Sequence, residues 1–251
     1  MPQDDIILDD ENKAVTFKGH YLYKSPRVYE ILKDTPENER LDKFASTVGY
    51  GIILDIDNYN KNYEVKSGDI VVDAGAHVGV FTRQYSDAVG PGGLVLAFEP
   101  DYRLFGIISH NMQDAKNVKI FPFGLWDSKE ILPFHIPSKY WGSSSFTHWH
   151  EGTEWTPARV KTLDSVIEDL NIGKVNFIKM DVEGAEMRIL KGAETTLRNV
   201  DALGIAAYHF QEGSLTKRTK PLVTKFLEER DFKIEIGHCS EGDYIVYANR
   251  R

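Results

Sequence analysis

Three acidic side chains stand close together in the stretch DVEGAE, directly after an apolar run. Asp181, Glu183 and Glu186 can accept hydrogen bonds, take up a proton or bind a hard cation. Gly184 permits a sharp bend after the apolar run, and Glu186 would then begin a helix, where the helix dipole favours a carboxylate. Two roles remain open for Asp181 and Glu183: they orient hydroxyl groups of a substrate, or they join a divalent metal site.

Another acidic position lies in the glycine-containing stretch VVDAGAHVG. Asp73 precedes Gly75 and Gly79, which allow a tight turn and a close approach of the backbone to a ligand. Glu99 ends the next apolar run, where a carboxylate can accept both hydroxyls of a ribose. The spacing differs from the G-x-G-x-x-G pattern of dinucleotide-binding proteins, because His77 occupies the position of the middle glycine. A nicotinamide-dependent oxidoreductase is therefore the weaker alternative.

His209 follows a later apolar run, ALGIAAYHF, and is the candidate general base. An imidazole with an ordinary pKa of about 6.5 can take a proton from a hydroxyl group at neutral pH. Alternation along a strand would point Tyr208 to the other side, so we leave Tyr208 out of the predicted site. A metal is possible but not favoured, because the place where a second acidic pair would stand reads YHFQEG.

Apolar runs alternate with helical patterns from about residue 65 onward, which predicts an α/β fold with a parallel sheet covered by helices on both faces. Two closing segments, FKIEIGH and DYIVYANR, predict a terminal hairpin and hence one late antiparallel strand. Ligands of open α/β sheets bind beyond the carboxyl ends of the strands. The acidic residues and the histidine above are therefore expected to share one edge of this sheet.

Two segments fall outside this alternation. Residues 1–64 are predicted to form an N-terminal extension to a domain that covers residues 65–251. In the extension we expect strands at 14–23 and 51–56, helices from Pro26 to Lys33 and over 37–46, and a contribution of Tyr50–Tyr63 to the pocket wall. Residues 138–157 form an insertion that is open to three interpretations: a substrate lid, structural packing or a metal-binding loop. Its candidate ligand-contacting residues are Trp141, Ser143, Ser144, Ser145, His148, Trp149, His150, Glu151 and Trp155.

The composition is that of a globular protein, with 251 residues, 41% hydrophobic residues and a formal net charge of −8. The acidic balance argues against a dedicated nucleic-acid binder, although an RNA substrate remains a minor alternative. The single cysteine, Cys239, excludes an internal disulfide. No apolar window has the length of a membrane span, and the N-terminal stretch lacks the pattern of a signal peptide. We therefore expect a cytoplasmic protein.

Taken in order, VVDAGAHVG, AFEP and FIKMDVEGAE followed by ILKGAE resemble the FkbM-type family of S-adenosylmethionine-dependent methyltransferases. The similarity covers roughly residues 65–250. It implies a Rossmann-like class I methyltransferase fold, with a seven-stranded, mostly parallel sheet and one antiparallel strand near the C-terminus. It also implies O-methylation of a small-molecule, sugar or lipid-like acceptor. The family often has Asn where this chain has His77.

The resemblance also implies a set of cofactor-binding residues. The turn after the first strand would surround the amino acid part of S-adenosyl-L-methionine, Glu99 would hold the ribose, and the loop after the third strand would lie near the adenine. The predicted catalytic residues are His209, Asp181 and Glu183, and no metal ligands are assigned. The predicted cofactor-binding residues are Asp73, Gly75, Ala76, His77, Gly79, Glu99, Leu125, Trp126, Asp127 and Asp181.

Overall fold

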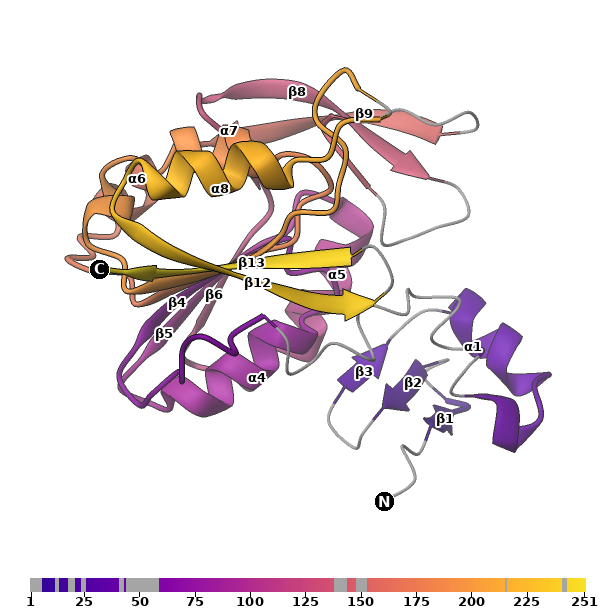
Figure 1. Ribbon diagram of the computed structural model, residues 1–251. Coiled ribbons are helices and arrows are strands. Elements are labelled where there is room, and N and C mark those ends of the chain that lie inside the picture. The colour runs from indigo at the N-terminus through magenta and orange to yellow at the C-terminus, as the bar shows by residue number, and fades with distance from the viewer. Residues whose placement is uncertain are drawn as a thin grey trace.

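The computed structural model describes most of the chain and contains three sheets (Figure 1). The described residues are 6–11, 14–17, 21–23, 26–40, 43, 59–137, 144–147, 153–214, 216–240 and 243–251. The strand expected at 51–56 lies outside them. Of the helix expected over 37–46, the described part holds a short 3-10 helix, Glu37–Glu39.

The central sheet has seven strands in the order β12-β13-β11-β10-β4-β5-β6. Strand β13 is antiparallel to both of its neighbours, whereas the pairings among the other five adjacent strands are parallel. The predicted sheet, mostly parallel with one antiparallel strand near the C-terminus, is thereby confirmed. Its strands are β4 (Ile70–Ala74), β5 (Leu94–Phe98), β6 (Val118–Phe121), β10 (Phe177–Met180), β11 (Ala202–Ala206), β12 (Phe232–Ser240) and β13 (Asp243–Arg250).

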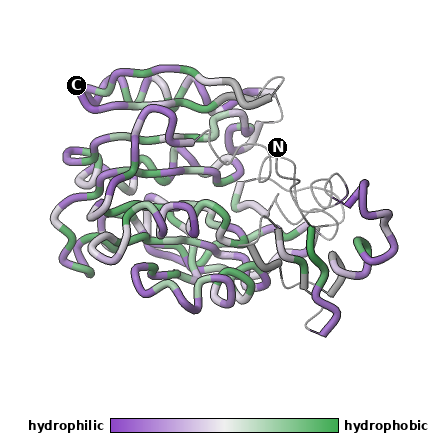
Figure 2. The backbone as a smooth tube through the Cα atoms, turned by 90° about the horizontal axis from the view of Figure 1, so that it is seen from below, coloured by the Kyte–Doolittle hydropathy of each residue, from purple (hydrophilic) through white to green (hydrophobic). Residues whose placement is uncertain are grey.

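Helices cover both faces of this sheet, which explains why its central strands are almost entirely apolar, with Asp73 of β4 and Lys179 of β10 as charged exceptions. Every residue of β10 and β11 is buried, and hydrophobic segments run through the interior strands in Figure 2. Helices α4 (Val80–Val89) and α5 (Tyr102–Asn111) pack on one face. Helices α6 (Leu163–Asp169), α7 (Glu186–Lys191) and α8 (Lys220–Glu228) pack on the other. No helix in the described part of the chain combines the length and the apolar character needed to cross a bilayer.

The predicted insertion is partly built into a second sheet. Strand β9 (Thr153–Lys161) pairs with β8 (Glu130–Pro137) on one side and with β7 (Gly124–Leu125) on the other. Residues 153–157 therefore belong to a strand and not to a loop, and Trp155 is 68% exposed there. Of the remaining insertion the structure describes residues 144–147. Trp141, Ser143, His148, Trp149, His150 and Glu151 lie outside the described residues.

The N-terminal region contains a small antiparallel sheet of β1 (Ile6–Asp9), β2 (Ala14–Phe17) and β3 (Tyr21–Tyr23). It is followed by α1, Pro26–Lys33, which has the bounds that the sequence predicted. The end of this region, by contrast, packs directly on the central sheet. A Cβ on Gly204 of β11 would lie 1.8 Å from the main-chain oxygen of Tyr59, and the Tyr63 ring stacks on Phe177 at 5.7 Å.

Candidate functional site

The turn after β4 contacts the carboxyl ends of the neighbouring strands β5 and β10. The N–H groups of Gly75 and Ala76 both donate to the main-chain oxygen of Phe98, at 3.1 and 3.0 Å. Gly75 has a φ of +77°, and a Cβ there would lie 1.8 Å from the main-chain oxygen of Asp181. Gly79, with a φ of +92°, precedes the first residue of α4. Only glycine permits this close approach of the turn to the end of β10.

Glu99 lies directly after β5 and is 5% exposed. Its Oε2 accepts a hydrogen bond from the main-chain N–H of His77 at 2.8 Å, and its Oε1 accepts one from that of Asp101 at 2.8 Å. Burial, with the nearby charge of Asp101, raises the pKa of Glu99 to about 8. Each oxygen has a second lone pair, so this carboxyl group can also receive hydroxyl groups of a ligand.

Asp73, at 0% exposure, is held by two side chains of the protein. Lys179 Nζ lies 3.0 Å from its Oδ1, and Thr82 Oγ1 donates to its Oδ2 at 2.6 Å. Lys179 also donates to the main-chain oxygen of Gly75 at 2.8 Å. Asp73 thus positions Lys179 and the glycine turn, and its predicted contact with the cofactor stays a prediction. Our sequence reasoning missed Lys179, although one cation within the buried run FIKM was a usable signal.

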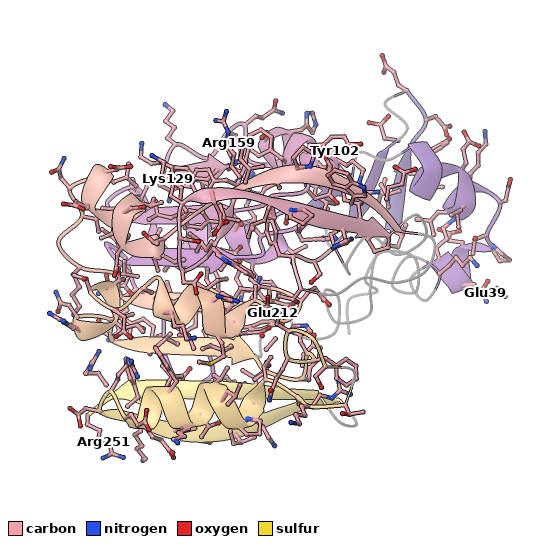
Figure 3. The ribbon with its side chains drawn as sticks, turned by 90° about the horizontal axis from the view of Figure 1, so that it is seen from above. Glu39, Tyr102, Lys129, Arg159, Glu212 and Arg251 are labelled. Atoms are coloured by element: carbon pink, nitrogen blue, oxygen red, sulfur yellow. The ribbon has the colours of Figure 1, made fainter. Side chains whose placement is uncertain are left out.

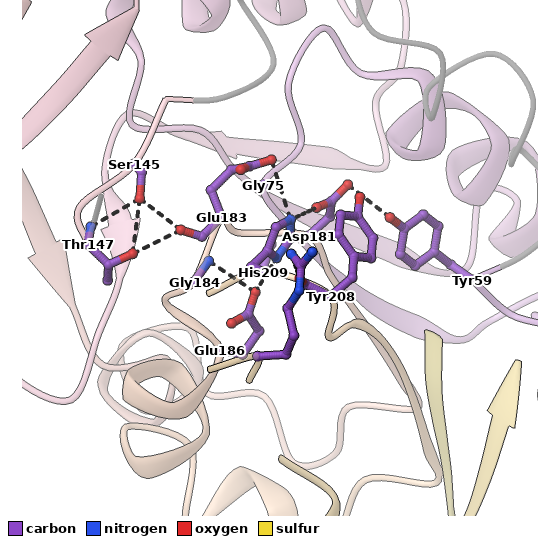
Figure 4. A network of polar contacts seen from close by, with 12 residues as sticks. Tyr59, Gly75, Ser145, Thr147, Asp181, Glu183, Gly184, Glu186, Tyr208 and His209 are labelled. Carbon is purple, nitrogen blue, oxygen red and sulfur yellow. Dashed lines mark hydrogen bonds and ion pairs between the residues drawn. The ribbon is translucent and has the colours of Figure 1, made fainter. Parts of the chain in front are cut away.

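The acidic stretch after β10 meets His209 as the sequence predicted (Figure 4). His209 Nε2 lies 3.4 Å from Asp181 Oδ1 and 3.4 Å from Glu183 Oε1. On the other side of the ring, Nδ1 lies 2.6 Å from Oε1 of Glu186, which is fully buried. Tyr59 donates its hydroxyl proton to Asp181 Oδ2 at 2.8 Å. Three carboxyl groups therefore surround one buried imidazole.

Glu183 owes its position to an unusual backbone. Its φ of 51° lies in the left-handed region, where a residue other than glycine is uncommon. Its main-chain oxygen accepts hydrogen bonds from Ser145 Oγ at 2.8 Å and from Thr147 Oγ1 at 2.9 Å (Figure 4). Two residues of the insertion thus hold this strained turn in place. Gly184 follows with a φ of 100°, and its N–H donates to Glu186 Oε1 at 3.2 Å.

The carboxylates around His209 shift the pKa of its imidazole. Burial lowers its pKa, but the charges of Glu183 and Glu186 raise it further, and the net result is a pKa well above the ordinary value. The two carboxylates therefore favour the doubly protonated form of the imidazole. The expectation of an ordinary pKa did not take account of the two carboxylates that contact the ring. The role of His209 as the general base stays a prediction.

Tyr208 was excluded by alternation along a strand, but the regular strand does not extend to this residue. Strand β11 ends at Ala206, so Tyr208 and His209 lie beyond the regular part of the strand. Their ring centroids are 4.4 Å apart, and Figure 4 shows the Tyr208 ring beside Asp181. Tyr208 thus belongs to the residues around the acidic cluster.

The three residues expected near the adenine make contacts within the protein: two lie in the core, and Asp127 pairs with an arginine. Leu125 and Trp126 are 3% and 5% exposed and lie in the main hydrophobic core. The Trp126 ring lies 5.7 Å from that of Phe146. Asp127 Oδ2 lies 2.9 Å from Nη1 of Arg188 on α7. A role of these residues in binding adenine stays a prediction.

Comparison with known proteins gives one family and several relatives. The family described as Methyltransferase FkbM domain matches residues 73–234. The hexuronic acid methyltransferase AglP of Haloferax volcanii is 28% identical over 191 residues, which cover 75% of this chain and 73% of that protein. The 2-O-methyltransferase NoeI of Sinorhizobium fredii is 26% identical over 148 residues, 53% of this chain and 60% of that protein. Aeropyrum pernix fibrillarin, solved with bound S-adenosyl-L-methionine, has 15% identity and a TM-score of 0.49, covering 74% of this chain and 68% of that one.

Proposed function

This chain belongs to the FkbM family of methyltransferases, and from that premise we propose that it methylates a hydroxyl group of a sugar-like acceptor with S-adenosyl-L-methionine. The match over residues 73–234 carries the proposal, because it includes the glycine turn, Glu99 and the acidic cluster with His209. The acceptor class is supported by two relatives, one named for hexuronic acid and one for 2-O-methylation. The aligned part covers 60% of the second relative.

The residues at the ends of β4 and β5 have the chemistry that this cofactor requires. The Glu99 carboxyl group would receive the two ribose hydroxyls, since each of its oxygens retains a lone pair beyond its backbone hydrogen bond. The turn from Gly75 to Gly79 leads into α4, whose N-terminal N–H groups suit the carboxylate of the amino acid part. Asp73 and Lys179 would fix the position of that turn, because Lys179 pairs with Asp73 and donates a hydrogen bond to the main-chain oxygen of Gly75.

The acidic cluster supplies the groups that an acceptor needs. When bound, S-adenosyl-L-methionine supplies a methyl group on a positively charged sulfur. Asp181 and Glu183 would accept hydrogen bonds from the acceptor hydroxyls, and one of these carboxylates would take the proton that the reacting hydroxyl loses. His209 would hold both carboxylates at the distances described above. Its role is then to position the acids rather than to act as the base.

Binding of S-adenosylhomocysteine to the purified chain, measured by calorimetry, tests the cofactor part of this proposal. At about pH 9, where the Glu99 carboxyl group with its pKa of about 8 is largely ionised, Glu99→Gln removes one acceptor of the ribose hydroxyls and should weaken binding by roughly 10-fold or more, since hydrogen bonds to a charged group contribute about 1.5–3 kcal/mol. Glu212→Gln is the matched control, because Glu212 pairs with Arg188 and is half exposed. No binding to the wild-type chain, or equal binding by both variants, would contradict the proposal.

The acceptor class is tested separately, with methyl-labelled cofactor and a panel of hexuronic acids, neutral sugars, fatty alcohols and RNA. We expect label in the sugar acids or sugars, and loss of that label in Asp181→Asn. Transfer to RNA alone, or to none of the sugars while cofactor binding is intact, would reject the sugar-like acceptor without affecting the cofactor assignment.

A further inference from the structure

Three potential metal ligands converge from two segments of the chain. His209 Nε2, Asp181 Oδ1 and Glu183 Oε1 all lie within 4.8 Å of one another. The imidazole nitrogen is 3.4 Å from each carboxylate oxygen. Ligands placed tetrahedrally around an ion at about 2.1 Å would be about 3.4 Å apart. The two distances from His209 therefore already match the spacing of a small divalent ion's ligands.

Two of these atoms are buried and have no hydrogen-bond partner. They are Nε2 of His209 and Oδ1 of Asp181, and His209 as a whole is only 7% exposed. The contact of 3.4 Å between these two atoms is an ion pair that lacks hydrogen-bond geometry. Buried polar atoms are nearly always satisfied in folded proteins, and an ion that binds both atoms would account for the exception.

Each of the three residues is also held from behind in an orientation that presents its ligand atom. Glu186 lies against Nδ1 of His209 at 2.6 Å, which places a proton on Nδ1 and directs Nε2 toward the acids. Tyr59 occupies Oδ2 of Asp181 and leaves Oδ1 facing the ring. The hydroxyl groups of Ser145 and Thr147 hold the backbone of Glu183. Histidine ligands of metals characteristically donate their second N–H to a carboxylate in this way.

We propose that Asp181, Glu183 and His209 form a binding site for one divalent transition-metal ion, with Glu186 as the residue that positions the histidine. Two carboxylates and one neutral imidazole are ligands that Mn²⁺ and Zn²⁺ both accept. Three protein ligands leave coordination positions open. Under the function proposed above, acceptor hydroxyls would occupy these positions, but metal binding itself does not depend on that function.

The alternative is a metal-free network in which a doubly protonated His209 neutralises the acids. In such a network, Nε2 of His209 and Oδ1 of Asp181 would remain 3.4 Å apart, and neither buried atom would have a hydrogen-bond partner. A metal titration distinguishes the two alternatives, because only the metal site binds a cation with a defined stoichiometry.

Metal titration of the untagged full chain, first stripped with a chelator, tests the proposal. The loss of the free Mn²⁺ signal in electron paramagnetic resonance reports binding without any need for activity. We expect saturation at about one ion per chain, displacement by Zn²⁺, and weakening by more than ~10-fold in Asp181→Asn and in His209→Gln. Glu186→Gln should weaken binding by roughly 10- to 100-fold, as is usual for a residue that supports a metal-bound histidine.

Glu212→Gln, which changes an exposed carboxylate near α7 (labelled in Figure 3), should bind Mn²⁺ like the wild type. Far-ultraviolet circular dichroism and thermal melting show whether each variant is folded. If a variant does not fold, the wild-type titration still decides: no saturable Mn²⁺ or Zn²⁺ binding overturns the proposal. Stoichiometric binding that survives in folded Asp181→Asn and His209→Gln also overturns it, because the ion would then be held elsewhere. Binding of S-adenosylhomocysteine is measured in parallel. If it is intact while metal binding fails, the metal site is rejected and the proposed function is not.

Discussion

Oε1 of Glu186 lies 2.6 Å from Nδ1 of His209, and both side chains are almost completely buried. This contact joins the first turn of α7 to the segment after β11, so the conformation of the acidic turn depends on it. Glu186→Gln keeps the shape of the side chain but removes its charge. We expect the free energy of unfolding to fall by about 1–3 kcal/mol, the range for a buried hydrogen bond to a charged group. Urea denaturation would measure it, with Glu212→Gln as the control, and a change below about 0.5 kcal/mol would contradict the prediction.

The glycine turn is expected to be intolerant of a single added methyl group. In Gly75→Ala the new Cβ would lie 1.8 Å from the main-chain oxygen of Asp181, at a φ of +77° that disfavours alanine. The left-handed conformation costs about 1–2 kcal/mol and the overlap about 1–3 kcal/mol more. Gly92→Ala is the matched control, because its Cβ would meet no atom within 4 Å. Equal denaturation midpoints for the two variants would show that the turn can move away from β10.

Lys179 and Asp73 form a buried ion pair, and removing one partner should cost more than removing both. In Lys179→Met the carboxylate of Asp73 loses its cation while remaining fully buried. We expect a loss of about 3–5 kcal/mol. The double variant Lys179→Met/Asp73→Asn should recover a large part of it, because no uncompensated charge is left. A double-mutant cycle by chemical denaturation measures the coupling, and strictly additive effects would contradict it.

The stability of the cofactor-free chain should depend on pH through Glu99. Burial raises the pKa of this carboxyl group from 4.5 to about 8 in the folded state. Because the folded-state pKa is above the unfolded value, the stability contribution is complete below about pH 4.5 and is lost as the pH rises through about 8. The wild type should therefore lose roughly 2–5 kcal/mol relative to Glu99→Gln between about pH 4.5 and pH 9. Parallel denaturation curves across this range would show it, and a constant difference would contradict it.

Much of the architecture could be predicted because the periodicity of hydrophobic residues follows from burial. Apolar runs separated by helical patterns predicted the parallel sheet, and the two closing segments predicted the antiparallel pair β12 and β13. The meeting of Asp181, Glu183 and His209 could also be predicted. These residues follow β10 and β11, which are neighbours and parallel, so their carboxyl ends lie side by side.

Other features depended on contacts that no local pattern records. Strand β9 was partly missed because its sequence, TEWTPARVK, has a proline and charges instead of a clear alternation. The pairing of Lys179 with Asp73 links two strands that are far apart in sequence. Tyr59 belongs to the segment that was expected to contribute to the pocket wall, but no pattern in that segment indicated that its hydroxyl would contact Asp181. In each case the tertiary structure determines which residues come into contact. The sequence alone could show only that a residue is of an unexpected type for its position.

The packing of residues from Tyr59 onward against β11 and β10 has a practical consequence for truncated forms of this protein. A gene fragment that begins at codon 65 would look complete by alignment, yet it would lack the hydroxyl that orients Asp181 and the ring that stacks on Phe177. The main chain of Tyr59, which packs against Gly204, would also be absent. Expression trials should therefore place the first codon upstream of Tyr59.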